Sequence, residues 1–335
     1  MKKTPTEATA PAKAATAPAA PAAQPIKSRR DFLGAGTRLA VAASLSTGAM
    51  GAFVREARAA TATKIDAQTL APGFTLLGGA GCNVLALAGP EGALLVDGGY
   101  KRTADELLAA MAKATGSRRV NTLINTHWHP AQTGCNDIVG KQGALIVAHE
   151  VTRLYLSRPV ASVDYTGLYG PLTEKGRPKL TTRTTGTLEF AGHPLQYGYL
   201  PAAHTNGDLY VHFPDANLVV AGGPVCSDGW PLLDWRNGAW LGGLVRAHEK
   251  LVSMIRPDTR VIPANGPVID GAELKRNHQM YAAFHEKMVL FQNRGYDSGD
   301  CIAQRPLREF EAKFGDPAAF IAGCFHSLNL AYSPD

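Results

Sequence analysis

The sequence has few cysteines and no paired cysteine motif. Its 335 residues include five cysteines, none of them in a C-x-x-C pair. A dithiol redox motif and a zinc ribbon both need closely spaced cysteines, so neither is expected. In an oxidising compartment Cys301 and Cys324 could form a disulfide, but an odd count leaves at least one cysteine outside any bridge. Buried, weakly polar side chains are the other interpretation of these residues.

Long apolar runs are also missing. The stretch at 39–54 is shorter than the roughly 18 to 20 residues that a membrane span needs, and it contains Gly, Ser and Thr. S-R-R-D-F-L precedes it at 28–33, and A-R-A-A follows at 57–60. This order is typical of a twin-arginine export signal. We therefore expect cleavage near Ala59, a periplasmic or exported protein, and no stable membrane span afterwards.

The chain beyond this leader has no excess of positive charge. Residues 1–59 hold nine Lys or Arg and three Asp or Glu, which accounts for the whole formal charge of +6. Nucleic-acid binding would need a basic patch on the folded part, so it is not expected. Residues 1–27 are rich in Ala, Pro and Thr, a composition typical of a disordered leader.

Histidines are the chemically informative residues that the sequence does contain. The stretch at 121–136 reads N-T-L-I-N-T-H-W-H-P-A-Q-T-G-C-N. Because side chains alternate in extended backbone, His127 and His129 are predicted on one face at the end of a strand. His204, in A-H-T-N-G-D, follows another predicted strand. An isolated H-x-H is often only hydrogen bonded, but three neutral imidazoles and a water form a recognised catalytic zinc site.

These motifs resemble those of the metallo-β-lactamase-fold hydrolases. The resemblance rests on A-L-L-V-D-G-G at 93–99, T-H-W-H-P at 126–130, A-H-T-N-G-D at 203–208, A-G-G at 221–223 and V-I-P-A-N-G-P at 261–267, which occur in the family's order. It implies an α/β fold, an αββα sandwich whose strand-end loops gather the histidines at one edge. It also implies that Asp97 braces the histidine loop and that Asp208 holds the loop behind His204. A plain turn-forming role is the other interpretation of Asp97.

The sequence departs from the family pattern at the second metal. The family's H-x-H-x-D-H motif would place its last two ligands at Ala131 and Gln132. Its bridging aspartate would fall at Gly223 and its final histidine at Asn265. None of these residues is a good ligand, so the resemblance leaves one Zn²⁺ on the three histidines. Whether a loop brings Cys226 or Asp228 inward as a replacement stays open.

The expected activity is hydrolysis of an ester, thioester or amide small-molecule substrate. Zinc on three histidines lowers the pKa of its bound water to about 7 and polarises an acyl carbonyl. Gln132 and Asn265 are expected to orient water or substrate, because neutral amides cannot act as general bases. The alternative is a non-catalytic binding or accessory protein with a structural metal or none. Iron-based oxygen chemistry is disfavoured, because di-iron relatives need the missing carboxylates.

Short apolar segments bounded by Gly and Pro predict most of the secondary structure. Strands are predicted at 74–77, 83–88, 93–96, 144–148, 187–190, 194–200, 209–213, 218–221 and 260–263, and helices at 103–115, 149–156, 243–255, 271–294 and within 305–331. The segment 158–186 is predicted to be an excursion that covers the metal. We expect a leader and signal at 1–59, one metallo-β-lactamase-like domain at 60–270, and a helical extension packed on it at 271–335. Neither the substrate nor the oligomeric state follows from the sequence.

Overall fold

Two mixed β-sheets form the centre of the part of the chain, residues 64–332, that the computed structural model describes. The leader and export signal predicted at 1–59 lie outside these residues. The first sheet runs in the order β1 (Asp66–Ala71), β2 (Phe74–Gly78), β3 (Val84–Leu87), β4 (Ala93–Val96), β5 (Val120–Ile124), β6 (Leu145–His149) and β7 (Leu180–Thr182). The second sheet runs in the order β13 (Ile269–Asp270), β12 (Arg260–Asn265), β11 (Leu218–Cys226), β10 (Leu209–Phe213), β9 (His193–Tyr199) and β8 (Thr185–Phe190).

The two sheets pack face to face through alternating side chains. In β3, Leu85 and Leu87 point into a cluster shared with the second sheet, whereas Val84 and Ala86 belong to the cluster under the helices. The second sheet contributes side chains such as Val211 to the shared cluster. A strand places successive residues on opposite faces, so each central strand contributes to two cores.

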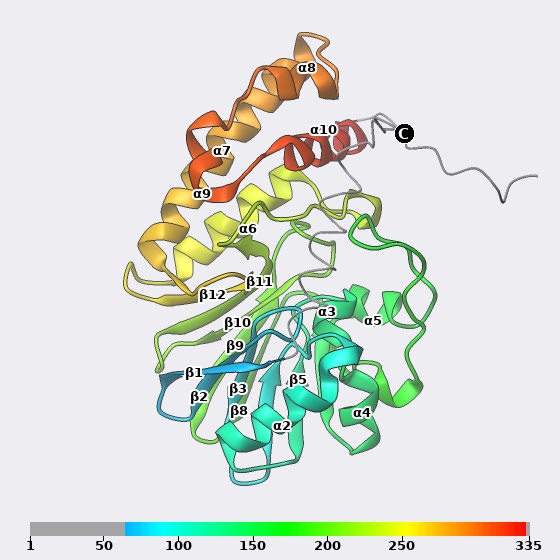
Figure 1. Cartoon of the computed structure of the whole chain (residues 1–335), viewed down its shortest axis with the longest axis vertical. Helices are drawn as coiled ribbons and strands as arrows, with labels where there is room; N and C mark the ends of the chain where they lie inside the picture. Colours follow the sequence, from blue (N-terminus) through cyan, green and yellow to red (C-terminus); the bar gives the residue numbers. More distant parts are fainter. Residues whose placement is uncertain (1–63, 333–335) are drawn as a thin grey trace, which may run out of the picture. The chain divides into compact units, whose positions relative to one another are not determined.

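Helices cover the outer face of each sheet, which gives the predicted αββα sandwich. Figure 1 shows α2 (Ala104–Thr115), α4 (Asn136–Lys141) and α5 (Glu150–Tyr155) on one side of the sheets, and α6 (Leu241–Met254), α7 (Gly271–Asn293) and α10 (Ala318–Tyr332) on the other. The described residues also form the short helices α3 (Pro130–Thr133), α8 (Ser298–Ala303) and α9 (Glu311–Phe314). Helix α2 ends at Gly116, whose φ of 73° suits a residue without a side chain.

The predicted strands and long helices are found in the structure, but the short elements α3, α4, α8 and β13 were not predicted, and three further places differ. Strand β1 is missed because most of its side chains are exposed and no apolar alternation marks it. The excursion at 158–186 is partly regular, since it contains β7 and a bridge between Val160 and Tyr169. The C-terminal helix is broken between α9 and α10, where Gly315 adopts a φ of 78°. Cys301 and Cys324 are both buried and do not form a disulfide.

The C-terminal helices share one hydrophobic core with the second sheet. Phe284 on α7 and Leu328 on α10 belong to the same buried cluster as Val219 and Val261 of the sheet. The domain boundary at 270 stays a prediction. Within the described residues, no helix combines the length and the apolar composition that crossing a bilayer requires.

A buried histidine in this core makes the stability of the folded protein depend on pH. His248 on α6 is 1% exposed, donates from Nδ1 to the Leu244 carbonyl at 3.0 Å, and has a pKa that burial lowers to about 4. An unfolded imidazole takes up a proton near pH 6.5, but the buried one stays neutral until about pH 4. Stability is therefore expected to fall by about 3 kcal/mol as the pH drops through this interval.

The variant His248→Gln is expected to lose less stability over the same interval, because it has no imidazole to protonate on unfolding. Urea denaturation of both proteins at neutral pH and near pH 4.5 measures the difference. Parallel losses in the two proteins would show that the buried imidazole does not contribute.

Candidate metal centre

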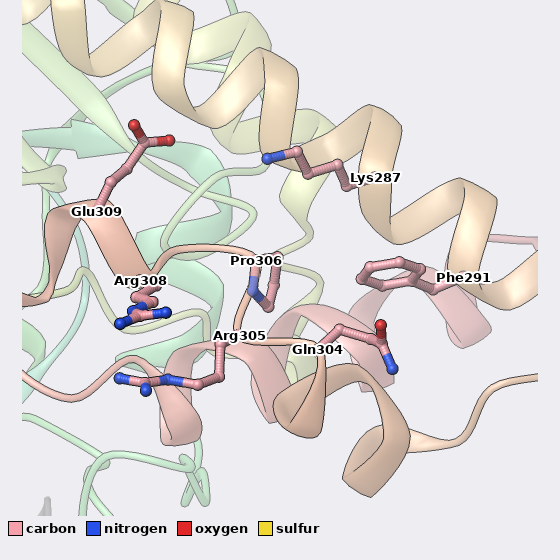
Figure 2. A pocket seen from close by; sticks show the side chains of 7 residues that line it. All are labelled: Lys287, Phe291, Gln304, Arg305, Pro306, Arg308 and Glu309. Carbon is pink, nitrogen blue, oxygen red and sulfur yellow. The ribbon is translucent and has the colours of Figure 1, made fainter.

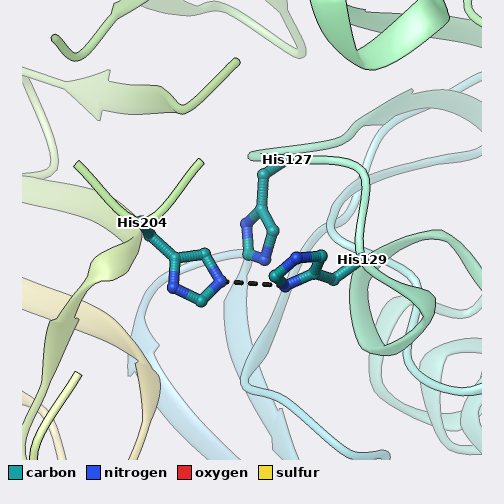
Figure 3. A group of neighbouring side chains, drawn as sticks. All are labelled: His127, His129 and His204. Carbon is teal, nitrogen blue, oxygen red and sulfur yellow. Dashed lines mark hydrogen bonds between the residues drawn. The ribbon is translucent and has the colours of Figure 1, made fainter. Parts of the chain in front are cut away.

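Three histidines from two distant loops meet at one edge of the sandwich. His127 and His129 follow β5, and His204 lies between β9 and β10. Their ring centroids are 4.5 to 4.9 Å apart, and each pair of rings meets edge to face (Figure 3). One nitrogen of each ring lies within 4.8 Å of the other two. The set of three predicted from the sequence is thus brought together, and all three are buried.

The path of the first loop differs from the prediction. Strand β5 ends at Ile124, so His127 and His129 do not alternate on a strand. His129 instead precedes α3 as its N-cap, with φ −61° and ψ 155°. Pro130 then starts the helix, where its missing N–H costs nothing. Extended backbone at the cap turns the second imidazole back toward the first.

Asp97 lies directly behind this loop. It follows β4 with a φ of 68°, and its carboxylate accepts hydrogen bonds from the backbone N–H and the hydroxyl of Thr126, both at 2.8 Å. Burial raises the pKa of Asp97 to about 7, and the two bonds from Thr126 oppose that rise. The contact fixes the backbone and the side chain of the residue immediately before His127.

Hydrogen bonds on the outer side fix the tautomers of His127 and His204. The Thr126 hydroxyl donates to Asp97 Oδ2, so its oxygen accepts from His127 Nδ1, 3.0 Å away. His204 Nδ1 lies 2.7 Å from the Leu232 carbonyl, which can only accept. Both rings are therefore protonated on Nδ1 and carry their lone pair on Nε2.

His129 is held in the opposite tautomer by a buried carboxylate. Its Nε2 lies 3.0 Å from Asp234 Oδ2, which also accepts from Ser162 Oγ at 2.9 Å and Asn237 Nδ2 at 2.8 Å. Burial alone would raise the pKa of Asp234, but the bonds from His129, Asn237 and Ser162 outweigh it and hold that pKa below its usual range. The lone pair of His129 is therefore on Nδ1.

The three lone pairs converge, which is the arrangement that a metal ion needs. His129 Nδ1 and His204 Nε2 are 3.0 Å apart, and in neutral rings both are acceptors. Burial lowers the pKa of His127 well below its usual value, and the neighbouring His204 and His129 lower it further. A cation bonded to all three nitrogens removes the repulsion between the lone pairs. Three fixed, neutral imidazoles thus fit a Zn²⁺-type ion.

His204 is positioned by a second buried carboxylate. Asp208 accepts from the backbone N–H of His204 at 2.7 Å, and from the N–H and hydroxyl of Thr205 at 2.9 and 2.7 Å. Burial raises the pKa of Asp208 to about 6, and the bonds from Thr205 and His204 oppose that rise. This closed turn holds the loop that carries the third histidine.

Comparison with known proteins agrees with the fold. A family model described as the metallo-beta-lactamase superfamily matches residues 77–266, more than half of the chain. The chain belongs to the metallo-β-lactamase superfamily. No curated protein matches it. The matched region contains His127, His129 and His204 and ends before α7 begins.

Solved metallo-β-lactamases share the fold of this superfamily member at low identity. The DIM-1 metallo-β-lactamase is 19% identical, with a TM-score of 0.53, over 65% of this chain and 97% of its own. TMB-1 is 17% identical, with a TM-score of 0.52, over the same shares. A metallo-β-lactamase from Pontibacter korlensis is 23% identical over 65% of this chain and 93% of its own, with a TM-score of 0.49. At these identities DIM-1 and TMB-1 show the fold alone.

The positions of the superfamily's second metal are filled differently in this member. Ala131 and Gln132 lie in α3, and Asn265 ends β12. A Cβ added to Gly223 would overlap the His204 ring. An aspartate at 223 is therefore incompatible with this position of His204. Among the described residues, the cluster of potential metal ligands consists of the three histidines and includes neither Cys226 nor Asp228. Cys226 Sγ instead donates to Asp228 Oδ1 at 3.1 Å.

Gln132 and Asn265 both line a cavity of about 840 Å³ that opens onto the three histidines. Gln132 is 3% exposed, and its Oε1 is buried without a hydrogen-bond partner among the described residues. A buried acceptor of this kind is costly unless something donates to it. A bound water or a substrate N–H would satisfy it.

Sequence reasoning missed the polar residues that surround His129. Ser162 and Asp164 come from the excursion at 158–186, where no residue had an assigned role, and Asp234 lies in a loop 105 residues from His129. Asp164 Oδ2 is 3.9 Å from His129 Nδ1, the nitrogen with the free lone pair. The side chain of Asp164 is 21% exposed and lines the same cavity. No spacing in the sequence links these residues to the histidine motif.

A second cavity shares no lining residue with the first. It has a volume of about 640 Å³ and is lined by Lys287, Phe291, Gln304, Arg305, Pro306, Arg308 and Glu309 (Figure 2). Its lining contains no histidine or cysteine, and its charged groups belong to long, flexible side chains. The metal chemistry belongs to the first cavity.

The close contact at Gly223 gives a test of the metal centre. Gly223→Ala is expected to push the His204 ring away and to weaken zinc binding by at least about tenfold. Titration against a chromophoric chelator measures this affinity. The matched control is Gly229→Ala, whose added Cβ would have its nearest neighbour, the Phe314 carbonyl oxygen, at 3.9 Å. Equal zinc affinity in the two variants would show that His204 does not bind the ion.

Proposed function

We propose that this protein is a hydrolase of small-molecule esters, thioesters or amides that uses one zinc ion. The observation that carries the proposal is the convergence of three imidazole lone pairs, each fixed by an outer hydrogen bond, in the wall of a cavity of about 840 Å³. Bound to His127 Nε2, His129 Nδ1 and His204 Nε2, zinc would supply a hydroxide nucleophile near neutral pH.

The chain's own residues position the reactants and move protons. Asp164 Oδ2 lies beside His129 Nδ1 and lines the cavity, so it can accept the proton of the attacking water and return it to the leaving group. It thereby takes the place of the carboxylate absent at Ala131. Gln132 Oε1 accepts a hydrogen bond from the water or the substrate. Asn265 also lines the cavity.

The second candidate function is a non-catalytic binding or accessory protein of the same fold. It is favoured by the lack of second-metal ligands at Ala131, Gly223 and Asn265. In that role a metal on the histidines would only be structural. The buried acceptor on Gln132 and the carboxylate of Asp164 beside the histidines favour the enzyme.

We also propose that the protein works outside the cytoplasm. The twin arginines at 29–30, followed by a short apolar run and A-R-A-A at 57–60, support export by the twin-arginine route. This route carries folded proteins, so the metal would be acquired before export.

Zinc content and turnover separate the two candidate functions. The purified protein is expected to hold about one equivalent of zinc and to hydrolyse at least one ester of a panel that contains esters and β-lactams. His204→Ala is expected to lose both zinc and activity, because one of three ligands is gone. Asp164→Asn is expected to keep its zinc and to lose roughly 100-fold in kcat.

Elemental analysis and initial rates measure these quantities side by side. Asp258→Asn, an exposed carboxylate change, is the control, with an unchanged zinc content and rate expected. If the wild-type protein holds stoichiometric zinc but hydrolyses no panel member, and so does not differ in rate from His204→Ala, the accessory role would be favoured over the hydrolase.

A further inference from the structure

The cavity at the histidines extends well beyond them along the C-terminal helix. Its far wall is made by small residues of α10, namely Ala318, Ala319, Ala322 and Gly323. The family model ends at residue 266, so this wall lies outside the matched region. What the cavity binds is thus determined in part by a segment that the superfamily match does not include.

The aromatic side of this far wall is packed and apolar. The Trp230 ring stacks on Phe320 with 5.2 Å between centroids, and it contacts Phe314 with 5.0 Å between centroids. Trp230 Nε1 donates to the Gly315 carbonyl at 2.9 Å, so the indole is fixed in place. Leu233 and Ile302 also line the cavity. The surface offers dispersion and hydrophobic contacts with no unpaired donor on the indole.

Three carboxylates line the cavity, with no lysine or arginine among them. They belong to Asp164, Asp228 and Asp316, and among the described residues the lining contains no Lys or Arg. Its basic side chains are imidazoles, those of the three histidines and of His326 on α10. The guanidinium of Arg236 stacks on the Trp235 ring at 5.3 Å but is not part of the lining. A substrate carboxylate would lose its hydration here and meet three carboxylates without an ammonium or guanidinium group to pair with.

We infer that the cavity binds uncharged acyl substrates whose hydrocarbon part lies against α10 and the Trp230 cluster formed by Trp230, Phe314 and Phe320. The inference rests on the proposed hydrolase function for the reaction, but the binding preference is a property of the wall itself. The acyl carbonyl lies at the histidines, and the hydrocarbon chain or ring extends toward Gly323. The three carboxylates of the cavity exclude substrates that carry a carboxylate on the hydrocarbon end. Carboxylate-bearing β-lactams are excluded for the same reason.

Two fluorescent probes of one scaffold test the binding preference without any turnover. N-phenyl-1-naphthylamine is neutral, and 8-anilinonaphthalene-1-sulfonate is nearly the same molecule with an anionic group. The neutral probe is expected to bind the zinc-free full-length protein at least about tenfold more tightly than the sulfonate. Binding is measured by titrating the fluorescence of each probe.

Variants of Gly323 locate the binding site. A Cβ at this helical glycine would meet no atom within 4 Å, so a larger side chain would project into open space without a clash. Gly323→Leu is expected to weaken binding of the neutral probe by about tenfold, because it fills the far end of the cavity. Ala331→Leu is the matched control, with binding close to wild type, because Ala331 is an exposed residue of α10 outside the cavity lining. Ala322→Leu provides a second filled variant, and thermal melting verifies that each is folded.

Turnover adds a second, separate readout. The kcat/KM for p-nitrophenyl octanoate is expected to exceed that for the mono-p-nitrophenyl ester of suberic acid, its chain-matched carboxylate, by at least about tenfold. Gly323→Leu is expected to reduce kcat/KM for the octanoate and to leave p-nitrophenyl acetate unchanged, because the short acyl group does not reach α10.

The outcomes distinguish the two proposals. Equal binding of the neutral and sulfonated probes, or unchanged binding in both folded leucine variants, would overturn the inference about the wall. Probe binding as expected with no ester hydrolysis would support the wall and contradict the hydrolase. Hydrolysis that favours the carboxylate ester would support the hydrolase and contradict the wall.

Discussion

Hydrogen bonds on the outer nitrogens of the three imidazoles are the interaction on which the site depends. Thr126, Asp234 and the Leu232 carbonyl each hold one ring and fix which nitrogen carries the proton. Without these partners the rings could rotate or change tautomer, and the inner lone pairs would not converge. Asp234 and Leu232 both come from the polypeptide between β11 and α6. Through Asp234, a segment next to the second sheet thus orients His129, which follows β5 of the first sheet.

The same packing favours one ion over two at the proposed metal site. The His204 ring occupies the space that a side chain at position 223 would need, so the glycine is a steric consequence of where this ligand lies. Asp164 enters from the excursion and places a carboxylate near His129 by a different route. A one-metal site with its acid–base group on a covering segment is therefore compatible with this fold. The C-terminal helices then close the far side of the cavity.

The sequence predicted the layered fold and the three ligands because both are encoded locally. Apolar alternation marks strands such as β3, and the H-x-H pair indicates a metal once His204 supplies a third imidazole. It could not predict Asp234 or Ser162, because loops distant in sequence bring them to His129. The predicted geometry of the H-x-H pair was also wrong, since His129 is the N-cap residue of α3 and does not alternate with His127 on a strand. Such orientation is set by tertiary contacts, which no short motif records.

The most direct measurement is a crystal structure of the zinc-soaked protein with anomalous diffraction at the zinc edge. One ion is expected, bonded to His127 Nε2, His129 Nδ1 and His204 Nε2 at about 2.0 to 2.1 Å. An ion bonded through any of the opposite nitrogens would contradict the role of the outer hydrogen bonds. So would a second ion beside Gln132, or no density among the three rings.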